Sequence, residues 1–263
     1  MILLKTKCQH FKNRVHARWN AILHEKIHSE FGVRVKYMFF KNAGSDTLIV
    51  SFPACAPNAA RYNYVRALSS FNCDKLFLLD DFGTNHQGCY LVEDRVECCV
   101  KSLILNKLNV CVGGYARVIF IGSSKGGYSA LNFSFLIPGV LCIIGSPQYF
   151  LGTYLDKENT KENLKFLIGE ITAENKEKLN NRLKQRVLTS SIHPQCVYFH
   201  YSNKEPTYMK HVRYMLDDLK SVRIRVVHDV KYYSSHDELS LYYPPFLIET
   251  IKKIINESPS NLQ

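Results

Sequence analysis

The stretch RVIFIGSSKGGYSALNFSF, residues 117–135, decides the fold. Its first five residues, 117–121, form a short apolar run rich in β-branched side chains, which is typical of a strand buried on both faces of a parallel sheet. A turn rich in glycine and serine follows at 122–127, and the apolar spacing of 128–136 is helical. The sequence therefore predicts a strand, a tight turn and a helix in succession.

This turn has the register of a nucleophile elbow centred on Ser124. The residues two before and two after the nucleophile must be small, and here they are Gly122 and Gly126. Ser123 would place an isoleucine and a lysine at those positions, so Ser124 is the candidate nucleophile. Two other interpretations are a plain glycine-rich turn and a phosphate-binding loop, but the G-x-x-x-x-G-K-[ST] pattern of the latter is missing.

Length and charge set the broad class of the protein. With 263 residues and 46% apolar content, the chain suits one large α/β domain or two small ones, and a single domain over 1–263 is the simpler expectation. Lysine and arginine outnumber aspartate and glutamate by 34 to 23, a net charge of +11. This excess favours anionic partners such as nucleic acid, acidic lipid, an anionic glycan or a phosphorylated donor.

Cysteine usage and targeting signals indicate a cytoplasmic protein. The nine cysteines are odd in number and scattered, without a C-x-x-C pair, which favours reduced thiols and no metal site. The apolar start at 1–4 is too short for a signal peptide, and no later stretch is long enough to span a bilayer.

The N-terminal segment 1–31 is predicted to carry a basic amphipathic helix that ends at Gly32. Seven apolar residues recur there at helical spacing, with lysine, arginine and histidine on the other faces: Phe11, Val15, Trp19, Ile22, Leu23, Ile27 and Phe31. Two interpretations stay open. The helix packs on the domain, or it docks on a partner or on an acidic surface such as the inner membrane.

Strand and helix patterns alternate between this helix and the elbow. Residues 33–41 and 47–52 read as a hairpin, 61–71 as a helix, 75–80 as a strand and 93–106 as a helix. Such alternation predicts an α/β fold whose central sheet is mainly parallel and has helices on both faces.

The loop 53–57 follows a predicted strand, at the edge where α/β sheets place ligands. In hydrolase-like folds this loop supplies one N–H of the oxyanion hole. Pro53 has no N–H to give, so we expect the donor to be Ala54, together with the N–H of Lys125 after the nucleophile.

A charge-dense insertion at 152–191 follows the next buried strand, 140–145, and we expect it to form a helical lid. Arg182, Lys184 and Arg186 are candidates to bind an anionic polymer there, the alternative being an ordinary solvated face.

A serine nucleophile needs a base and an acid, usually in the chain order serine, acid, histidine. His236 follows the last predicted strand, where this order places the base, and His228 is the second choice. Glu205 is the only carboxylate on the loop after the strand 195–201, so it is the candidate acid. Asn203 is a weaker candidate because it carries no charge.

Three motifs resemble the capsule polysaccharide O-acetyltransferases of bacterial capsule clusters. They are the extended elbow 122–127, the run RYNYV at 61–65 and the run SHD at 235–237, and the likeness spans about residues 47–255 in motif order. That family has an α/β-hydrolase fold and is related to the acetyltransferase of accessory secretion systems. It offers no counterpart for the basic helix.

The resemblance implies a cytoplasmic enzyme that moves acetyl from acetyl-CoA to sugar hydroxyls of an anionic capsule polymer. Ser124 matches the nucleophile, His236 the base and Glu205 the acid, although the family has an aspartate in a shorter loop at the last position. Other capsule-synthesis proteins, or the inner membrane, are the further partners it suggests.

Two other functions use the same features. An esterase or deacetylase would need the same three residues and would release acetate without an acceptor. A non-catalytic scaffold of a capsule complex would bind polymer or partner through the basic helix and the lid. A nucleic-acid-binding module is not expected, because no binding motif accompanies the positive charge.

Overall fold

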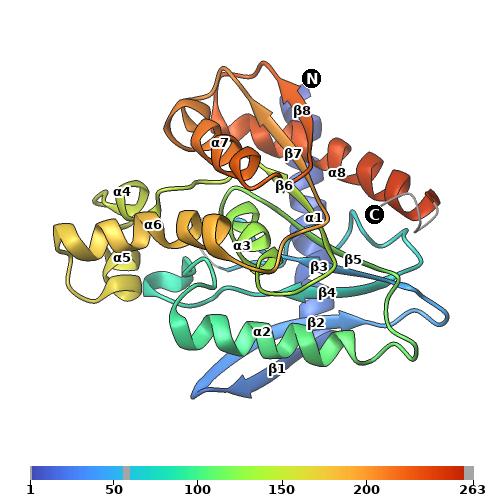
Figure 1. Ribbon diagram of the computed structural model, residues 1–263. Coiled ribbons are helices and arrows are strands. Elements are labelled where there is room, and N and C mark those ends of the chain that lie inside the picture. The colour runs from blue at the N-terminus through green and yellow to red at the C-terminus, as the bar shows by residue number, and fades with distance from the viewer. Residues whose placement is uncertain (1, 56–59, 258–263) are drawn as a thin grey trace.

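The computed structural model describes residues 2–55 and 60–257, and a mixed sheet lies at its centre (Figure 1). In the described residues this sheet has eight strands in the order β1-β2-β4-β3-β5-β6-β7-β8. Strands β1, β2 and β4 pair antiparallel, and all pairs from β4 to β8 are parallel. The strands are β1 Glu25–Glu30, β2 Val33–Phe40, β3 Thr47–Ser51, β4 Asp74–Leu78, β5 Arg117–Ser123, β6 Val140–Gly145, β7 Cys196–Ser202 and β8 Val226–Lys231.

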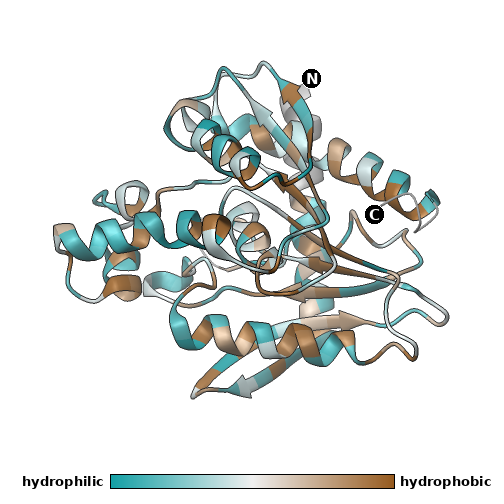
Figure 2. Ribbon diagram, in the orientation of Figure 1, coloured by the Kyte–Doolittle hydropathy of each residue, from teal (hydrophilic) through white to brown (hydrophobic). Residues whose placement is uncertain are grey.

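The sheet is buried on both faces: every residue of β3 to β7 is buried, and most of them are apolar. In β5, Val118 and Phe120 face one core, whereas Ile119 and Ile121 face the other. Figure 2 shows these strands in brown. The predicted mainly parallel sheet is confirmed.

Helices cover both faces, as predicted. The first core contains side chains from α2 (Asp94–Leu108), α3 (Lys125–Ser134), α6 (Ala173–Thr189) and α7 (Arg213–Ser221). The second contains side chains from α8 (Leu239–Asn256), and Ala17 of α1 (Ile2–His24). Short helical turns complete the chain: η1 Thr84–His86, the π-helical η2 Tyr208–Val212 and η3 His236–Glu238.

The segment between β6 and β7 is a helical insertion, as expected. It consists of α4 (Leu151–Leu155), α5 (Lys161–Ile168) and α6. Leu164, Leu179 and Leu183 anchor it in the first core, and most of the other residues of α6 are hydrophilic (Figure 2).

The predicted extent of the N-terminal helix was wrong. The helix ends at His24, and the next six residues form β1, which pairs with β2. Phe31 and Gly32 both have positive φ angles, 55° and 73°, as the two central residues of a type I′ hairpin turn require. Ile27 lies in β1 and Phe31 in the turn, so their four-residue spacing fitted the helical pattern by chance.

Two further local predictions were wrong. Strands β2 and β3 do not form a hairpin, because β4 lies between them in the sheet. Residues 61–71 form a series of turns rather than a helix. Tyr64 has a φ of 63°, which an α-helix does not allow. This irregular segment forms one wall of the candidate site.

Candidate active site

The elbow is built as the sequence predicts. Strand β5 ends at Ser123, α3 begins at Lys125, and Ser124 between them has φ 51° and ψ −119°, a strained conformation for a residue with a side chain. A Cβ on Gly122 would lie 2.3 Å from the backbone of Gly126, so neither position tolerates a larger residue. Ser124 is thereby held at the carboxyl edge of the sheet.

The structure brings the predicted nucleophile, base and acid together. His236, in η3 after β8, has its Nε2 atom 2.9 Å from Ser124 Oγ. Its Nδ1 atom lies 2.8 Å from Oε2 of Glu205, which follows β7. A proton on Nδ1 is donated to the buried carboxylate, which leaves Nε2 free to accept the Ser124 hydroxyl.

A buried hydrogen-bonded chain holds Glu205 from behind. The Ser146 hydroxyl donates to Glu205 Oε1 and lies 3.5 Å from the hydroxyl of Tyr233. That hydroxyl is 3.3 Å from Nε2 of His200, whose Nδ1 lies 2.6 Å from Asp229. Burial lowers the pKa of His200, although the carboxylate of Asp229 opposes the shift. Glu205 is thus held by His236 and by Ser146, and the sequence predicted only the contact with His236.

Gln148 is a site residue that sequence reasoning missed. Its side-chain Nε2 donates to Ser124 Oγ over 3.0 Å, and the residue is fully buried. Its Oε1 has no hydrogen-bond partner among the described residues. The signal was available, since residues 146–148 follow β6 at the same sheet edge as the elbow.

The two predicted oxyanion-hole donors differ in the structure. Lys125 is the first residue of α3, so its backbone N–H has no acceptor within the helix. The N–H of Ala54 instead donates to Asn63 Oδ1 over 3.0 Å. Gln148 Nε2, by contrast, lies 3.0 Å from Ser124 Oγ.

The Lys125 side chain turns away from the site into a buried ion pair. Its Nζ lies 2.9 Å from Asp80 Oδ2, and both residues are almost completely buried. Asp80 also accepts the N–H of Cys89, and Asp81 pairs with Lys36 at 2.7 Å. Asp80 therefore ties the loop that ends at Cys89 to the first residue of α3, whereas Asp81 is tied to β2.

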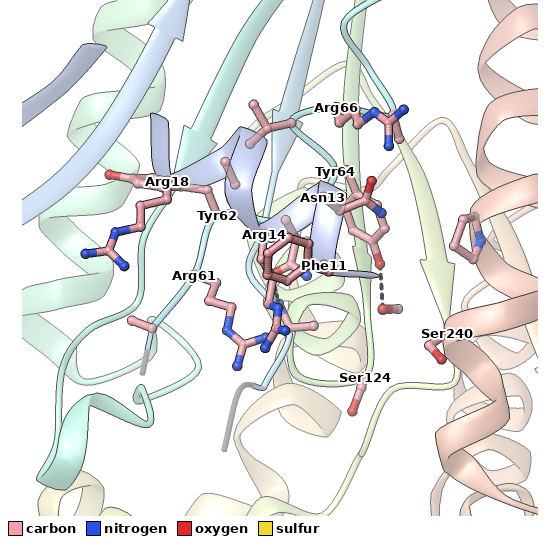
Figure 3. Close-up of a pocket in the computed structure, with 18 of the residues that line it drawn as sticks. Phe11, Asn13, Arg14, Arg18, Arg61, Tyr62, Tyr64, Arg66, Ser124 and Ser240 are labelled. Atoms are coloured by element: carbon pink, nitrogen blue, oxygen red, sulfur yellow. Dashed lines mark hydrogen bonds between the residues drawn. The ribbon is translucent and has the colours of Figure 1, made fainter. Parts of the chain in front are cut away.

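A large pocket opens over Ser124 and His236 (Figure 3). It encloses about 1520 Å³ between α1, residues 60–67, the elbow and the start of α8. Tyr64 lies in its wall and shares a hydrogen bond of 2.6 Å with Ser123 Oγ, which occupies that serine. Four arginines also line it: Arg14, Arg18, Arg61 and Arg66.

The predicted lid does not cover this pocket, since no residue of 152–191 lines it. Arg182 and Arg186 point instead at Glu97 of α2, with N–O distances of 3.1 and 2.6 Å. Burial alone would raise the pKa of Glu97, but the two guanidinium groups hold it below its usual value. These arginines, predicted to bind polymer, tie α6 to the sheet-covering helices, and Lys184 lies on the same helix outside the pocket.

Other candidates lie away from the site. His228, the second choice for the base, sits in β8 with its Nδ1 3.2 Å from the Tyr201 hydroxyl.

The eight cysteines whose side chains the structure describes are free thiols, as predicted, and Cys8 lies outside them. No helix in the described part of the chain has the length and hydropathy that crossing a bilayer requires.

Comparison with known proteins gives matches at the level of structure. No family model and no curated protein matches the sequence. The capsule O-acetyltransferase of Neisseria meningitidis serogroup A superposes with a TM-score of 0.70 at 20% identity, over 87% of this chain and 96% of that one. A histidine-to-alanine mutant of it has been solved with CoA. The FphF serine hydrolase of Staphylococcus aureus has a TM-score of 0.59 at 11% identity, over 89% and 98%.

The chain has the α/β-hydrolase fold. A third similar structure, the Gap123 glycosylation-associated complex of Streptococcus agalactiae, has a TM-score of 0.73 at 16% identity over 90% of this chain and 47% of that one. The similar structures thus include both groups that the sequence motifs resembled. In this α/β-hydrolase-fold protein, the strained serine lies at the elbow after β5, beside the histidine that follows β8.

Proposed function

We propose that this protein is an O-acetyltransferase that moves acetyl from acetyl-CoA to sugar hydroxyls of an anionic capsule polymer. The observation that carries the proposal is the hydrogen-bonded series Ser124, His236, Glu205 at the floor of a large pocket, with distances of 2.9 and 2.8 Å. The α/β-hydrolase fold, shared with a capsule O-acetyltransferase solved with CoA, supports it.

In the first half-reaction, Ser124 Oγ attacks the thioester carbonyl while His236 Nε2 takes the serine proton. The C–S bond then breaks, and the CoA thiolate receives that proton from His236. Glu205 keeps the imidazole oriented and stabilises its positive charge. The product is acetyl-Ser124 and free CoA.

In the second half-reaction, a sugar hydroxyl attacks the acetyl-serine carbonyl and gives its proton to His236. The bond between the carbonyl carbon and Ser124 Oγ breaks, and the serine regains its proton. In both steps the carbonyl oxygen develops negative charge, which the N–H of Lys125 and Nε2 of Gln148 stabilise. Ala54 joins them only when Asn63 releases its N–H.

Pocket size favours transfer over simple hydrolysis. A volume of about 1520 Å³ exceeds the roughly 300–1,000 Å³ of common small-molecule pockets. It therefore has room for a donor and a polymer segment together. An esterase or deacetylase with the same triad is the second candidate, because serine hydrolases share the fold.

Labelled acetyl-CoA with candidate capsule polymers tests the proposal. Wild-type protein should form a labelled acetyl-enzyme and pass the label to polymer, and Ser124→Ala should lose both by about 10³-fold or more. Ser123→Ala is the matched control, since the hydroxyl of Ser123 is hydrogen-bonded to that of Tyr64. Release of acetate without transfer would identify an esterase, and absence of any serine labelling would indicate a scaffold.

We also propose that the enzyme works in the cytoplasm and touches the inner membrane surface through α1. The free thiols support a cytoplasmic location, because the cytoplasm keeps cysteines reduced. Trp19, Ile22 and Leu23 are 62%, 68% and 70% exposed, and the helix sequence has no acidic residue. Wild-type protein should sediment with vesicles containing anionic phosphatidylglycerol, and Trp19→Ala with Leu23→Ala should not. Equal sedimentation with neutral vesicles, or of the variant, would refute the contact.

A further inference from the structure

The pocket wall holds four guanidinium groups that have no acidic partner. Arg14 and Arg18 come from α1, one helical turn apart, and Arg61 and Arg66 come from the irregular segment after β3. None of the four forms an ion pair among the described residues. Nη1 of Arg66 is buried without a hydrogen-bond partner in the same set.

The acidic residues of the wall do not neutralise this charge. Only Glu25 and Asp237 carry carboxylates among the described lining residues, and Glu25 already accepts the hydroxyl of Tyr62 over 2.8 Å. Like charges gathered in a partly enclosed space repel one another. A buried N–H without an acceptor also raises the free energy of the folded protein. A bound anion relieves the repulsion, whereas the unpartnered donor of Arg66 lies in another part of the wall from Arg14 and Arg61 (Figure 3).

The chemistry of the wall indicates a phosphate-bearing ligand. Arginine presents paired N–H donors that match the oxygens of a phosphate, and it keeps its charge at every physiological pH. In Figure 3, the side chains of Arg14 and Arg61 point into the same part of the pocket, on the α1 side of Ser124. The reacting serine and the positive wall are therefore separate regions of one pocket.

From this arrangement, and resting on the proposed function, we infer that Arg14 and Arg61 bind the phosphate groups of the acyl donor. Acetyl-CoA carries its thioester at one end and its phosphates at the other, which fits a pocket with a nucleophile on its floor and arginines on its wall. Arg18 and Arg66 extend the positive surface. Helix α1 is then part of the donor site, although its sequence resembled nothing in the motif family.

Calorimetric titration with free CoA tests the inference without turnover. Arg14→Gln and Arg61→Gln should each weaken CoA binding about tenfold, and the double variant should weaken it more, as loss of charge-assisted hydrogen bonds requires. Binding of pantetheine, which has no phosphate, should stay as in the wild type. Lys12→Gln is the matched control, because Lys12 is exposed on the same helix and outside the pocket.

Three results would overturn this inference and leave the proposed function standing. They are unchanged CoA affinity in both variants, an equal loss of affinity for CoA and for pantetheine, and a loss of affinity for an anionic capsule polymer with CoA affinity unaffected. The last would assign the arginines to the acceptor. If wild-type protein fails to bind CoA while Ser124 still reacts with a fluorophosphonate, the proposed donor is wrong as well. The two failures are therefore distinguishable.

Discussion

Replacing Glu205 by glutamine should leave the fold intact and remove most of the catalytic rate. Glutamine has nearly the same shape, and with its amide oxygen facing His236 its NH₂ group faces Ser146, whose hydroxyl can turn to accept it. What disappears is the negative charge that faces the imidazole ring at 2.8 Å. Because the Glu205 side chain has no exposed surface, water does not replace that charge.

The expected loss follows from Coulomb's law. During acylation His236 becomes an imidazolium whose charge centre lies about 3–4 Å from that of the carboxylate. At an effective dielectric constant of about 20, two such charges attract by about 4–6 kcal/mol. Since each 1.36 kcal/mol corresponds to a factor of ten in rate, kcat should fall by about 10³–10⁴.

Release of CoA from acetyl-CoA in the presence of acceptor measures this rate. Asp217→Asn is the control, since it removes the same charge at an exposed position outside the site. Near-UV circular dichroism establishes that both variants are folded. If folded Glu205→Gln protein keeps more than a tenth of the wild-type kcat, the carboxylate does not stabilise the imidazolium and the assignment of the acid fails.

Three further outcomes are expected. Gln148→Ala should lower kcat by about 10²–10³ with little change in KM, because an oxyanion donor acts mainly in the transition state, and a loss below threefold would exclude that role. Asp80→Asn should cost about 3–5 kcal/mol in urea unfolding, since it leaves Lys125 buried without its charge partner, and a cost under 1 kcal/mol would contradict this. Burial lowers the pKa of His211 to about 4, so below pH 6.5 only the unfolded chain takes up its proton. The free energy of unfolding should therefore fall by up to about 3 kcal/mol between pH 6.5 and 4. In His211→Asn, whose amide oxygen still accepts the Phe150 N–H, this fall should be correspondingly smaller.

The elbow could be predicted because its determinants are local. The contact between Gly122 and Gly126 depends on a four-residue interval, which the sequence shows directly. The positions of His236 and Glu205 followed from chain order, because each comes directly after a strand and parallel strands bring their carboxyl ends to one edge. Sequence therefore located the three residues, while their hydrogen bonds needed the structure.

The errors lie where distant segments decide the outcome. Arg182 and Arg186 looked like free lid charges, but their partner Glu97 is 85 and 89 residues away along the chain. Similarly, β4 enters between β2 and β3 only through long-range pairing. Composition and periodicity carry no information on such partners.

The two proposals for α1, donor binding and membrane contact, use different faces of the helix. Successive residues turn by about 100° around a helix, so Arg14, Arg18 and Ala21 lie within about 60° of one another and face the pocket. Trp19 and Leu23 lie about 100–180° further round, and they are exposed. A donor bound by the first face and a bilayer touching the second would not compete for the same side chains.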